Sequence, residues 1–331
     1  MKKKILSGMR PTGDLHLGHL VGALDNWVKL QEDYKCYYMV ADWHAISTAY
    51  EDKINLRELT YSIVADWLAV GISPEKSVIF IQSSVKEHSE LHLLLSMITP
   101  LSWVERNPSF KETIEQLSSK NISTYGFLGY PVLQAADILM YMAECVPVGI
   151  DQIPHLELSR EIVRRFNNLY GETFPEPQAI LTKTPKLSGL DKRKMSKSYG
   201  NFILISEPEK ELKIKINNMI TDPERIRKTD PGHPEICSVF EYHQCFNKPE
   251  TETISADCKN AKIGCVECKR KLFEIINNLI SPIRDKKNHY MEKQSELQEI
   301  IEAGDKKARE AAAATMEKVR NNMRIGLRQN K

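Results

Sequence analysis

Two patterns of apolar and polar positions follow each other in turn along the first 85 residues. Short apolar runs predict buried strands, and longer segments with an apolar residue every three or four positions predict amphipathic helices. The expected strands are Lys4–Gly8, Cys36–Ala41 and Ser77–Gln82, and the expected helices are Leu17–Tyr34 and Leu56–Val70. This order predicts a parallel sheet wound with helices, on which ligands bind beyond the carboxyl ends of the strands.

Residues 88–123 break this alternation. Their apolar residues outnumber what one helix face requires: Leu91, Leu93, Leu94, Leu95, Met97, Ile98, Leu101 and Trp103. The excess predicts a helical insertion with apolar surface left over for a dimer contact. The alternative is that the segment packs on the protein's own sheet.

Helices and strands alternate again from residue 131, and strands largely cease after Gly200. The next expected elements are a helix over Pro131–Met142, a strand over Val146–Gly149, a helix over Gln152–Phe166 and a strand over Ala179–Leu181. Helices are then expected over Pro208–Asn218, Cys268–Ile280 and Glu292–Met323. The pattern predicts a doubly wound α/β domain over residues 1–200 and an all-helical domain over 201–331.

Composition favours an ordinary soluble protein. Of the 331 residues, 41% are hydrophobic and 27% are charged, with a net charge of only +2. The first seven residues are basic but lack the apolar stretch of a signal peptide, and no apolar run reaches a membrane span, so we expect a cytoplasmic protein. From residue 269 onward, 15 Lys and Arg face 9 Asp and Glu, which fits contact with a phosphate backbone but also an ordinary solvated helix surface.

Five of the seven cysteines lie within 32 residues: Cys237, Cys245, Cys258, Cys265 and Cys268. In a chain without a secretion signal, such clustering favours metal or cluster ligation over disulfides. By count alone, four thiolates suit a zinc ion and an iron–sulfur cubane equally well.

The first predicted strand leads into a loop that reads Pro11-Thr12-Gly13-Asp14-Leu15-His16-Leu17-Gly18-His19. His16 and His19 are three residues apart at the start of a helix, where their ring N–H groups can donate to phosphate oxygens. Gly18 leaves room for a flat ring to lie over the chain. We therefore expect a nucleotide triphosphate at this loop.

A second polar loop, 175 residues later, reads Lys194-Met195-Ser196-Lys197-Ser198. Attack by a carboxylate on an α-phosphate places negative charge on the departing pyrophosphate. Lys194 and Lys197 can meet that charge as it develops, which lowers the barrier. Lysine-rich loops are otherwise simply solvated.

Two further strings place polar groups near the same edge of the sheet. At a strand-to-helix turn, Asp151 can accept hydrogen bonds from ribose hydroxyls or cap the helix. Around the start of the helix expected over Pro131–Met142, Tyr130, Gln134 and Asp137 project from one face in apolar surroundings. Asp137 can accept from an indole N–H, or it can pair with a backbone amide.

Together these strings resemble the bacterial-type tryptophanyl-tRNA synthetases, a class I aminoacyl-tRNA synthetase family, along essentially the whole chain. The strings that carry the resemblance are Ser7–Gly13, His16–His19, Ala41–Ile46, Phe80–Ser83, Ala135–Leu139, Val146–Gln152 and Lys194–Ser198. The resemblance implies a Rossmann-like catalytic domain with Lys194–Ser198 in a mobile 191–200 loop, and an anticodon-binding C-terminal domain. The implied partners are tRNA(Trp), tryptophan, ATP with Mg²⁺ and a second copy of the chain.

The resemblance also implies individual roles. Catalysis would fall to His16, His19, Lys194 and Lys197. ATP would contact Arg10, Pro11, Thr12, Gly18, His19, Gly149, Ile150, Asp151, Leu187, Lys194, Met195, Ser196, Lys197 and Ser198. Tryptophan would contact Asp137, His44, Tyr130, Gln134 and Gln152. In the subset of the family with a C-terminal [4Fe–4S] cluster, the ligands would be Cys237, Cys258, Cys265 and Cys268, with zinc as the alternative and Cys245 as a spare.

Three other functions remain open at this level. The Tyr130, Gln134 and Asp137 face is similar to the phenol-binding face of tyrosyl-tRNA synthetases. A non-catalytic RNA-binding paralogue could keep the fold, although binding alone would not require both the His16–His19 and the Lys194–Ser198 strings. A nucleotidylyltransferase shares a histidine loop of this kind, but not the long basic helical domain or the Asp137 face.

Overall fold

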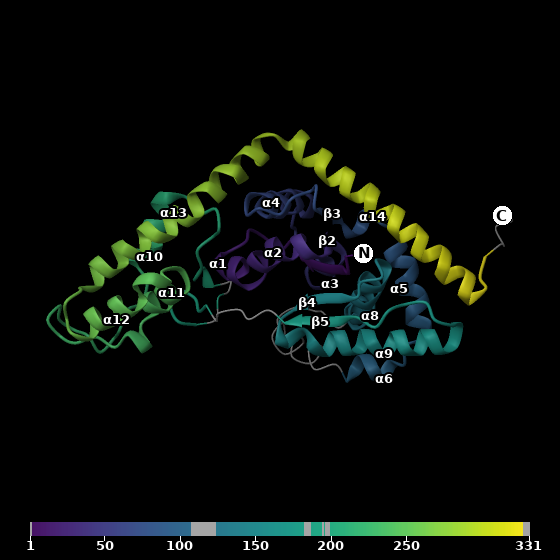
Figure 1. The fold of residues 1–331 in the computed structure, drawn as a ribbon, viewed down its shortest axis with the longest axis horizontal. Coiled ribbons are helices and arrows are strands. Elements are labelled where there is room, and N and C mark those ends of the chain that lie inside the picture. Colours follow the sequence, from purple (N-terminus) through teal and green to yellow (C-terminus); the bar gives the residue numbers. More distant parts are fainter. Residues whose placement is uncertain (1, 107–123, 182–186, 194, 196–198, 327–331) are drawn as a thin grey trace.

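A five-stranded parallel sheet lies at the centre of the molecule (Figure 1). The computed structural model describes residues 2–106, 124–181, 187–193, 195 and 199–326. The strand order is β3–β2–β1–β4–β5, and every neighbouring pair is parallel. The bounds are β1 (Lys4–Met9), β2 (Lys35–Val40), β3 (Ser77–Ile81), β4 (Cys145–Val148) and β5 (Gln178–Leu181).

Helices cover both faces of the sheet, so each strand contributes to two apolar cores. In β1, Ile5 belongs to a core that includes Trp27 and Trp67, whereas Leu6 belongs to the core on the other face with Leu139 and Phe166. The helices are α1 (Leu17–His19), continued by a π-helical turn (Leu20–Leu24) into α2 (Asp25–Asp33), then α3 (Asp42–Ala49), α4 (Leu56–Ala69), α5 (Glu87–Ile98), α6 (Leu101–Glu105), α8 (Tyr125–Met140) and α9 (Ile153–Tyr170).

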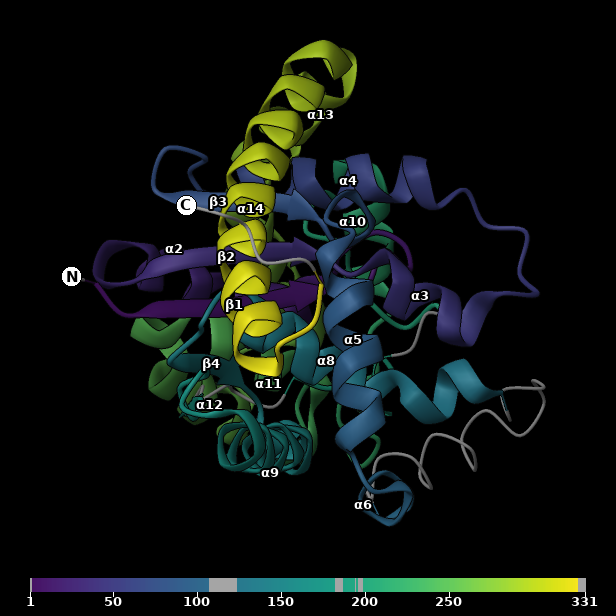
Figure 2. The same cartoon turned by 90° about the vertical axis from the view of Figure 1, so that its right-hand side faces the viewer.

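The chain after residue 200 is helical. Its elements are α10 (Glu209–Asn217), α11 (Ser238–Phe246), α12 (Thr251–Lys259), α13 (Cys265–Glu292) and α14 (Gln294–Met323). Figure 1 shows α13 rising away from α10, α11 and α12, after which α14 returns over the sheet. Figure 2 shows α14 passing in front of the strands.

Close packing fixes α14 on the edge strand β3. A Cβ atom at Gly304 would lie 1.7 Å from the carbonyl oxygen of Ile79, so only glycine allows this approach. The next residue, Asp305, accepts a hydrogen bond from the Ile81 N–H at 2.9 Å. The helix therefore covers an edge that would otherwise expose unpaired backbone groups.

The fold class expected from the sequence is confirmed: a doubly wound parallel sheet with a helical C-terminal region. The predicted start of one helix is wrong, because α8 begins at Tyr125 and contains Pro131 in its interior. Thr124 caps α8 by accepting from the Phe127 N–H at 3.2 Å, which supplies a start upstream of the proline. Helix α13 likewise continues twelve residues beyond the expected end, through Pro282 to Glu292.

The predicted insertion is helical where it is described, in α5 and α6, and residues 107–123 lie outside the described residues. Leu91, Leu94 and Leu95 pack into the core, as the alternative interpretation expected, while other apolar side chains of the insertion remain exposed. None of the helices in the described ranges combines the length and the apolar character needed to cross a bilayer.

Candidate active site

A cavity of about 450 Å³ opens at the carboxyl ends of the central strands. Its walls include Gly8 and Met9 from β1 and Val148 from β4, on the two sides of the point where the strand order reverses. Doubly wound sheets bind ligands at this position. Seven residues predicted to bind tryptophan or ATP line the cavity: Arg10, His44, Tyr130, Gln134, Asp137, Gly149 and Gln152.

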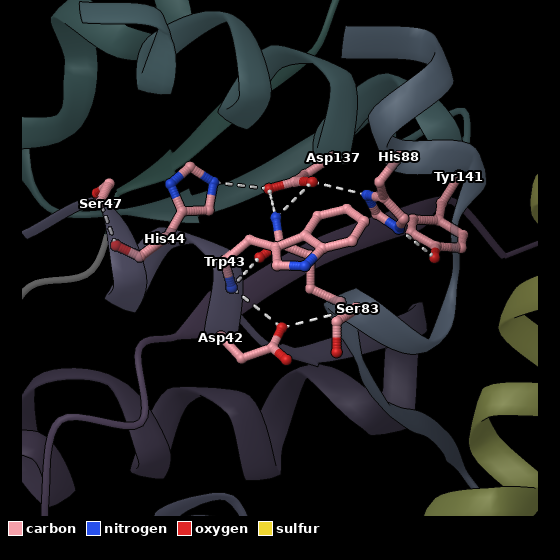
Figure 3. Close-up of polar contacts among 9 residues, drawn as sticks. Asp42, Trp43, His44, Ser47, Ser83, His88, Asp137 and Tyr141 are labelled. Atoms are coloured by element: carbon pink, nitrogen blue, oxygen red, sulfur yellow. Dashed lines mark hydrogen bonds and ion pairs between the residues drawn. The ribbon is translucent and has the colours of Figure 1, made fainter. Parts of the chain in front are cut away.

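Asp137 is the centre of a polar network in the cavity wall (Figure 3). It lies on α8 and is only 1% exposed. His44 on α3 donates to Oδ2 at 2.9 Å, and the His88 Nδ1–H donates to Oδ1 at 2.6 Å. The amide of Gln82 lies 2.9 Å from both oxygens. Each carboxylate oxygen therefore has two nitrogen donors within hydrogen-bonding distance.

These donors decide the charge of Asp137. Burial alone would raise the pKa of the carboxyl group, because the charged form loses its hydration. Hydrogen bonds from His44 and His88, together with the electrostatic interaction of both rings with the carboxylate, instead lower the pKa of Asp137 to about 2. The site thus contains a buried, permanently charged acceptor at neutral pH.

Gln82, His88 and Tyr141 were not predicted from the sequence. Gln82 follows β3 directly and also accepts from the Trp43 N–H at 3.1 Å. His88 is fully buried in the first turn of α5, and its Nε2 lies 2.7 Å from the Tyr141 hydroxyl. Gln82 and His88 reach Asp137 from elements 49 or more positions away in the chain, a proximity that spacing alone does not reveal, whereas Tyr141 follows Asp137 by four residues and contacts it only through His88.

Other residues of the cavity lining are also fixed by hydrogen bonds. The Tyr130 hydroxyl lies 3.1 Å from Nε2 of His155, and burial raises the pKa of Tyr130 to about 12, so the phenol keeps its proton. Arg10 donates to the Thr48 hydroxyl at 3.4 Å. His155 is a further site residue that the sequence patterns did not single out.

The histidine loop is paired with the segment that follows the lysine loop. The Leu17 N–H donates to the Ile203 carbonyl at 2.9 Å, and the Ile205 N–H donates to the Leu15 carbonyl at 3.0 Å. His16 lies between these bonds, in a bridge with Leu204. The two regions are 175 or more residues apart in sequence, and this pairing places them together.

Within the histidine loop, the two rings are in contact. The His16 and His19 ring centroids are 3.8 Å apart, and His19 Nδ1 accepts from the His16 N–H at 3.1 Å. A Cβ atom at Gly18 would lie 3.0 Å from the His16 ring and 3.2 Å from the Met195 sulfur. The described member of the lysine loop, Met195, therefore lies beside the histidine loop.

The other predicted ATP-binding residues are spread around this junction. Pro11 is buried, Thr12 closes a turn by donating to the Arg10 carbonyl at 2.9 Å, Leu187 packs against the core, and Ile150 is 78% exposed. Lys194, Ser196, Lys197, Ser198 and the side chain of Asp151 lie outside the described residues.

The four predicted cysteine ligands line a second, small cavity in the helical C-terminal region. Cys237, Cys258, Cys265 and Cys268 line about 20 Å³ of space between α11, α12 and α13, and Cys245 is not part of its wall. Burial and the neighbouring sulfurs raise the pKa of Cys268 to about 12. No group of three or more His, Cys, Asp or Glu side chains in the described part of the chain is arranged to hold a metal ion. The donor set has the soft thiol chemistry that a metal–sulfur centre requires.

Comparison with known proteins gives the same class as the fold and the cavity. A family model described as tRNA synthetases class I (W and Y) matches residues 2–281, so the chain belongs to this family of aminoacyl-tRNA synthetases. Within it, the chain groups with the tryptophan–tRNA ligases. The enzyme of Thermotoga maritima is 56% identical over 97% of this chain and 99% of its own length, and that of Aquifex aeolicus is 45% identical over 97% and 100%.

A solved structure agrees with this assignment. Tryptophanyl-tRNA synthetase from Campylobacter jejuni, crystallised with ADP and tryptophan, superposes with a TM-score of 0.89 at 35% sequence identity. The match covers 97% of this chain and 100% of that protein.

Proposed function

We propose that the protein activates tryptophan with Mg-ATP and then charges tRNA(Trp). The tryptophan carboxylate attacks the α-phosphorus, the bond to the β-phosphate oxygen breaks, and tryptophanyl-AMP and pyrophosphate form. The acyl group then passes to the 2′-hydroxyl of the terminal adenosine, and AMP leaves. The observation that carries this proposal is the buried, ionised Asp137 in the wall of a cavity at the nucleotide-binding edge of the sheet.

Asp137 is the group we propose to recognise the side chain of tryptophan. An indole N–H is a donor without acceptor capacity, and an ionised carboxylate is a pure acceptor. His44 lines the same cavity, whereas Gln82 and His88 support Asp137 from behind. We therefore expect the indole N–H to replace His44 as the hydrogen-bond donor to Oδ2 of Asp137. Tyr130, Gln134 and Gln152 would orient the rest of the amino acid.

The phosphate side combines described and undescribed residues. We propose that His16, His19 and Arg10 contact the triphosphate and that Gly149 and Asp151 face the ribose. Lys194 and Lys197 would stabilise the departing pyrophosphate, a role supported by the backbone pairing between Leu15–Leu17 and Ile203–Ile205. Magnesium would reach the site with ATP and shield its phosphate charges.

Tryptophan-dependent exchange of labelled pyrophosphate into ATP tests the first step. We expect exchange with tryptophan, and roughly 10⁴-fold less with tyrosine, since buried polar groups left unpaired reject the wrong substrate strongly. Exchange that prefers tyrosine would identify the chain as a tyrosyl-tRNA synthetase instead. Exchange without any amino acid would indicate a nucleotidylyltransferase, and nucleotide or RNA binding without exchange would indicate a non-catalytic paralogue.

Lys197→Ala tests the phosphate side separately. Removing a cation that acts on developing charge should lower kcat for exchange by roughly 10²–10³-fold with little change in tryptophan binding. Lys192→Ala, in the same polar segment, is the control. A Lys197→Ala enzyme with wild-type kcat would remove this lysine from the mechanism.

We also propose that Cys237, Cys258, Cys265 and Cys268 hold a structural [4Fe–4S] cluster. A four-iron cluster is larger than a single ion, so its ligands stand farther apart than the ligands of zinc. Protein purified without air should be brown and contain iron and sulfide. Cys258→Ser should lose the colour and Cys245→Ser should keep it, because Cys245 lies outside the cavity. Colourless protein with one zinc per chain would support the zinc alternative.

The domain roles follow the same assignment. We propose residues 1–200 as the catalytic domain, 201–331 as the anticodon-binding domain and the cytoplasm as the compartment.

Exposed Leu93, Met97 and Leu101 on α5 and α6 support a homodimer through the predicted insertion. Light scattering should give twice the chain mass for the wild type and a lower mass for Met97→Glu. A wild-type monomer at micromolar concentration would contradict the dimer.

A further inference from the structure

Lys287 on α13 is buried between two carboxylates. Its Nζ atom lies 3.0 Å from Oδ1 of Asp66 on α4 and 3.1 Å from Oδ1 of Asp14. The side chain of Lys287 is 9% exposed, and that of Asp66 is fully buried. Charged side chains are rarely buried without partners, and here Lys287 forms ion pairs with both Asp66 and Asp14.

The two carboxylates hold the histidine loop. Asp66 Oδ2 accepts from the Leu15 N–H at 3.5 Å, and Asp14 accepts from the Ser62 hydroxyl at 2.7 Å. Asp14 and Leu15 immediately precede His16 in the chain. Lys287 therefore pairs with both of the carboxylates that bind the start of the histidine loop, while the carbonyl of Leu15 accepts from Ile205.

The helix that carries Lys287 also carries two of the four clustered cysteines. Cys265 and Cys268 occupy the first turn of α13, and Lys287 lies five residues before its end. At about 1.5 Å per residue, roughly 30 Å of continuous helix joins the cysteine cavity to the histidine loop. Figure 1 shows α13 rising from the helices α11 and α12, and its contacts with α4 bring it to the α/β domain.

We propose that Lys287 is a positioning residue for ATP. Through Asp14 and Asp66 it sets the position of the histidine loop relative to α13, so that the helical C-terminal region and the nucleotide site keep a fixed geometry. The inference rests on the proposed function in one respect, namely that the histidine loop faces ATP. Lys287 itself contacts no substrate and acts only through the two carboxylates.

The electrostatics agree with this arrangement. Burial raises the pKa of Asp66 to about 6, Lys287 opposes that rise, and the nearby Asp14 adds to it. The polar groups that face Asp66 are thus Lys287 from α13, Asp14 from the loop and the Leu15 amide. Without the lysine, the Asp66 carboxyl would take up a proton at a still higher pH and weaken its bond to Leu15.

The test compares Lys287→Met with Lys286→Met, because Lys286 is exposed on the same helix. Misplacement of a substrate-binding loop can cost on the order of 10²-fold, so we expect that loss in kcat/KM for ATP in Lys287→Met only. KM for tryptophan should not change, since the Asp137 pocket is built from other helices. The acid limb of kcat/KM for ATP should move to higher pH, and Lys287→Arg should restore part of the rate.

A second variant covers the case in which Lys287→Met does not fold, since removing one partner of a buried ion pair is strongly destabilising. Lys287→Met combined with Asp66→Asn leaves no unpaired buried charge and should still bind ATP weakly by calorimetry. ATP binding and kinetics equal to those of Lys286→Met would overturn the inference. Absence of tryptophan-dependent exchange in the wild type would instead overturn the proposed function, and the calorimetric comparison would still test Lys287.

Discussion

Asp137 and Asp66 are two buried carboxylates with opposite ionisation behaviour. Their exposed fractions are 1% and 0%, so burial does not distinguish them. The pKa of Asp137 is lowered to about 2, whereas that of Asp66 is raised to about 6. Asp137 lies in the wall of the cavity, and Asp66 accepts from the Leu15 N–H beside the histidine loop.

The difference comes from the donors that each carboxylate meets. Asp137 has two imidazoles and an amide at 2.6–2.9 Å. Asp66 has one lysine at 3.0 Å, one backbone amide at 3.5 Å and the repulsion of Asp14. Hydrogen bonds to the charged form offset desolvation in the first case and fall short of it in the second. The fixed charge of Asp137 suits substrate recognition. The carboxyl group of Asp66 is closer to neutrality, so its role in holding the histidine loop depends on Lys287.

The largest expected effect comes from removing the fixed charge. Asp137→Ala leaves the indole N–H and the supporting donors without an acceptor, so kcat/KM for tryptophan in pyrophosphate exchange should fall by roughly 10⁴-fold. Asp66→Asn should leave KM for tryptophan unchanged. Equal effects of the two substitutions on tryptophan would mean that the two carboxylates do not have separate roles.

The second prediction uses stability against pH. The pKa of Asp66 is raised above its ordinary value of 3.8 to about 6, so its contribution to stability is greatest below pH 4 and is lost as pH rises through 6. The pKa of Asp137 is lowered to about 2, so its contribution is full above pH 4 and is lost as pH falls toward 2.

Urea unfolding of the wild type and Asp66→Asn separates these contributions. As pH falls from 6 to 4, the wild type should gain about 2 kcal/mol of unfolding free energy relative to Asp66→Asn. A constant difference between the two proteins across that range would show that Asp66 does not titrate there.

A smaller effect should follow from weakening the support of Asp137. His88→Leu removes a hydrogen bond that lowers the pKa of Asp137, so that pKa should rise. The acid limb of kcat/KM for tryptophan should then move to higher pH, with a loss of about 10–100-fold at its maximum, as for groups that orient a binding residue.

Tyr141→Phe is the matched control for His88→Leu. It removes the hydroxyl 2.7 Å from His88 Nε2 but keeps the bond between His88 and Asp137, so the pH profile should change least. A larger shift of the acid limb in Tyr141→Phe than in His88→Leu would contradict the claim that His88 stabilises Asp137 directly and that Tyr141 acts only through His88.

Local patterns predicted the strands and most of the helices, and seven residues named from the sequence strings and the family resemblance line the cavity. The short apolar runs correspond to β1–β5 within one residue at each end, because each buried strand carries its own apolar pattern. Tyr130, Gln134 and Asp137 share one helix face, so their common location follows from spacing. Their proposed contacts with tryptophan remain predictions.

The remaining features depend on contacts between distant elements. His88 was expected at the start of an insertion, and nothing in its neighbourhood signals the contact with Asp137, 49 positions away. Lys287 fell beyond the expected end of its helix, and its partner Asp14 is 273 positions distant. Pro131 indicated a helix start, whereas Thr124 provides the cap. Long-range ion pairs of this kind leave no periodic signal.

The most direct test of the central claim uses an analogue of tryptophan in which sulfur replaces the indole N–H. Pyrophosphate exchange should be measured with this analogue and with tryptophan, in the wild type and in Asp137→Ala. We predict a roughly 10⁴-fold preference for tryptophan in the wild type, reduced to near parity in the variant. Equal kcat/KM for both amino acids in the wild type would contradict recognition by the buried, ionised carboxylate.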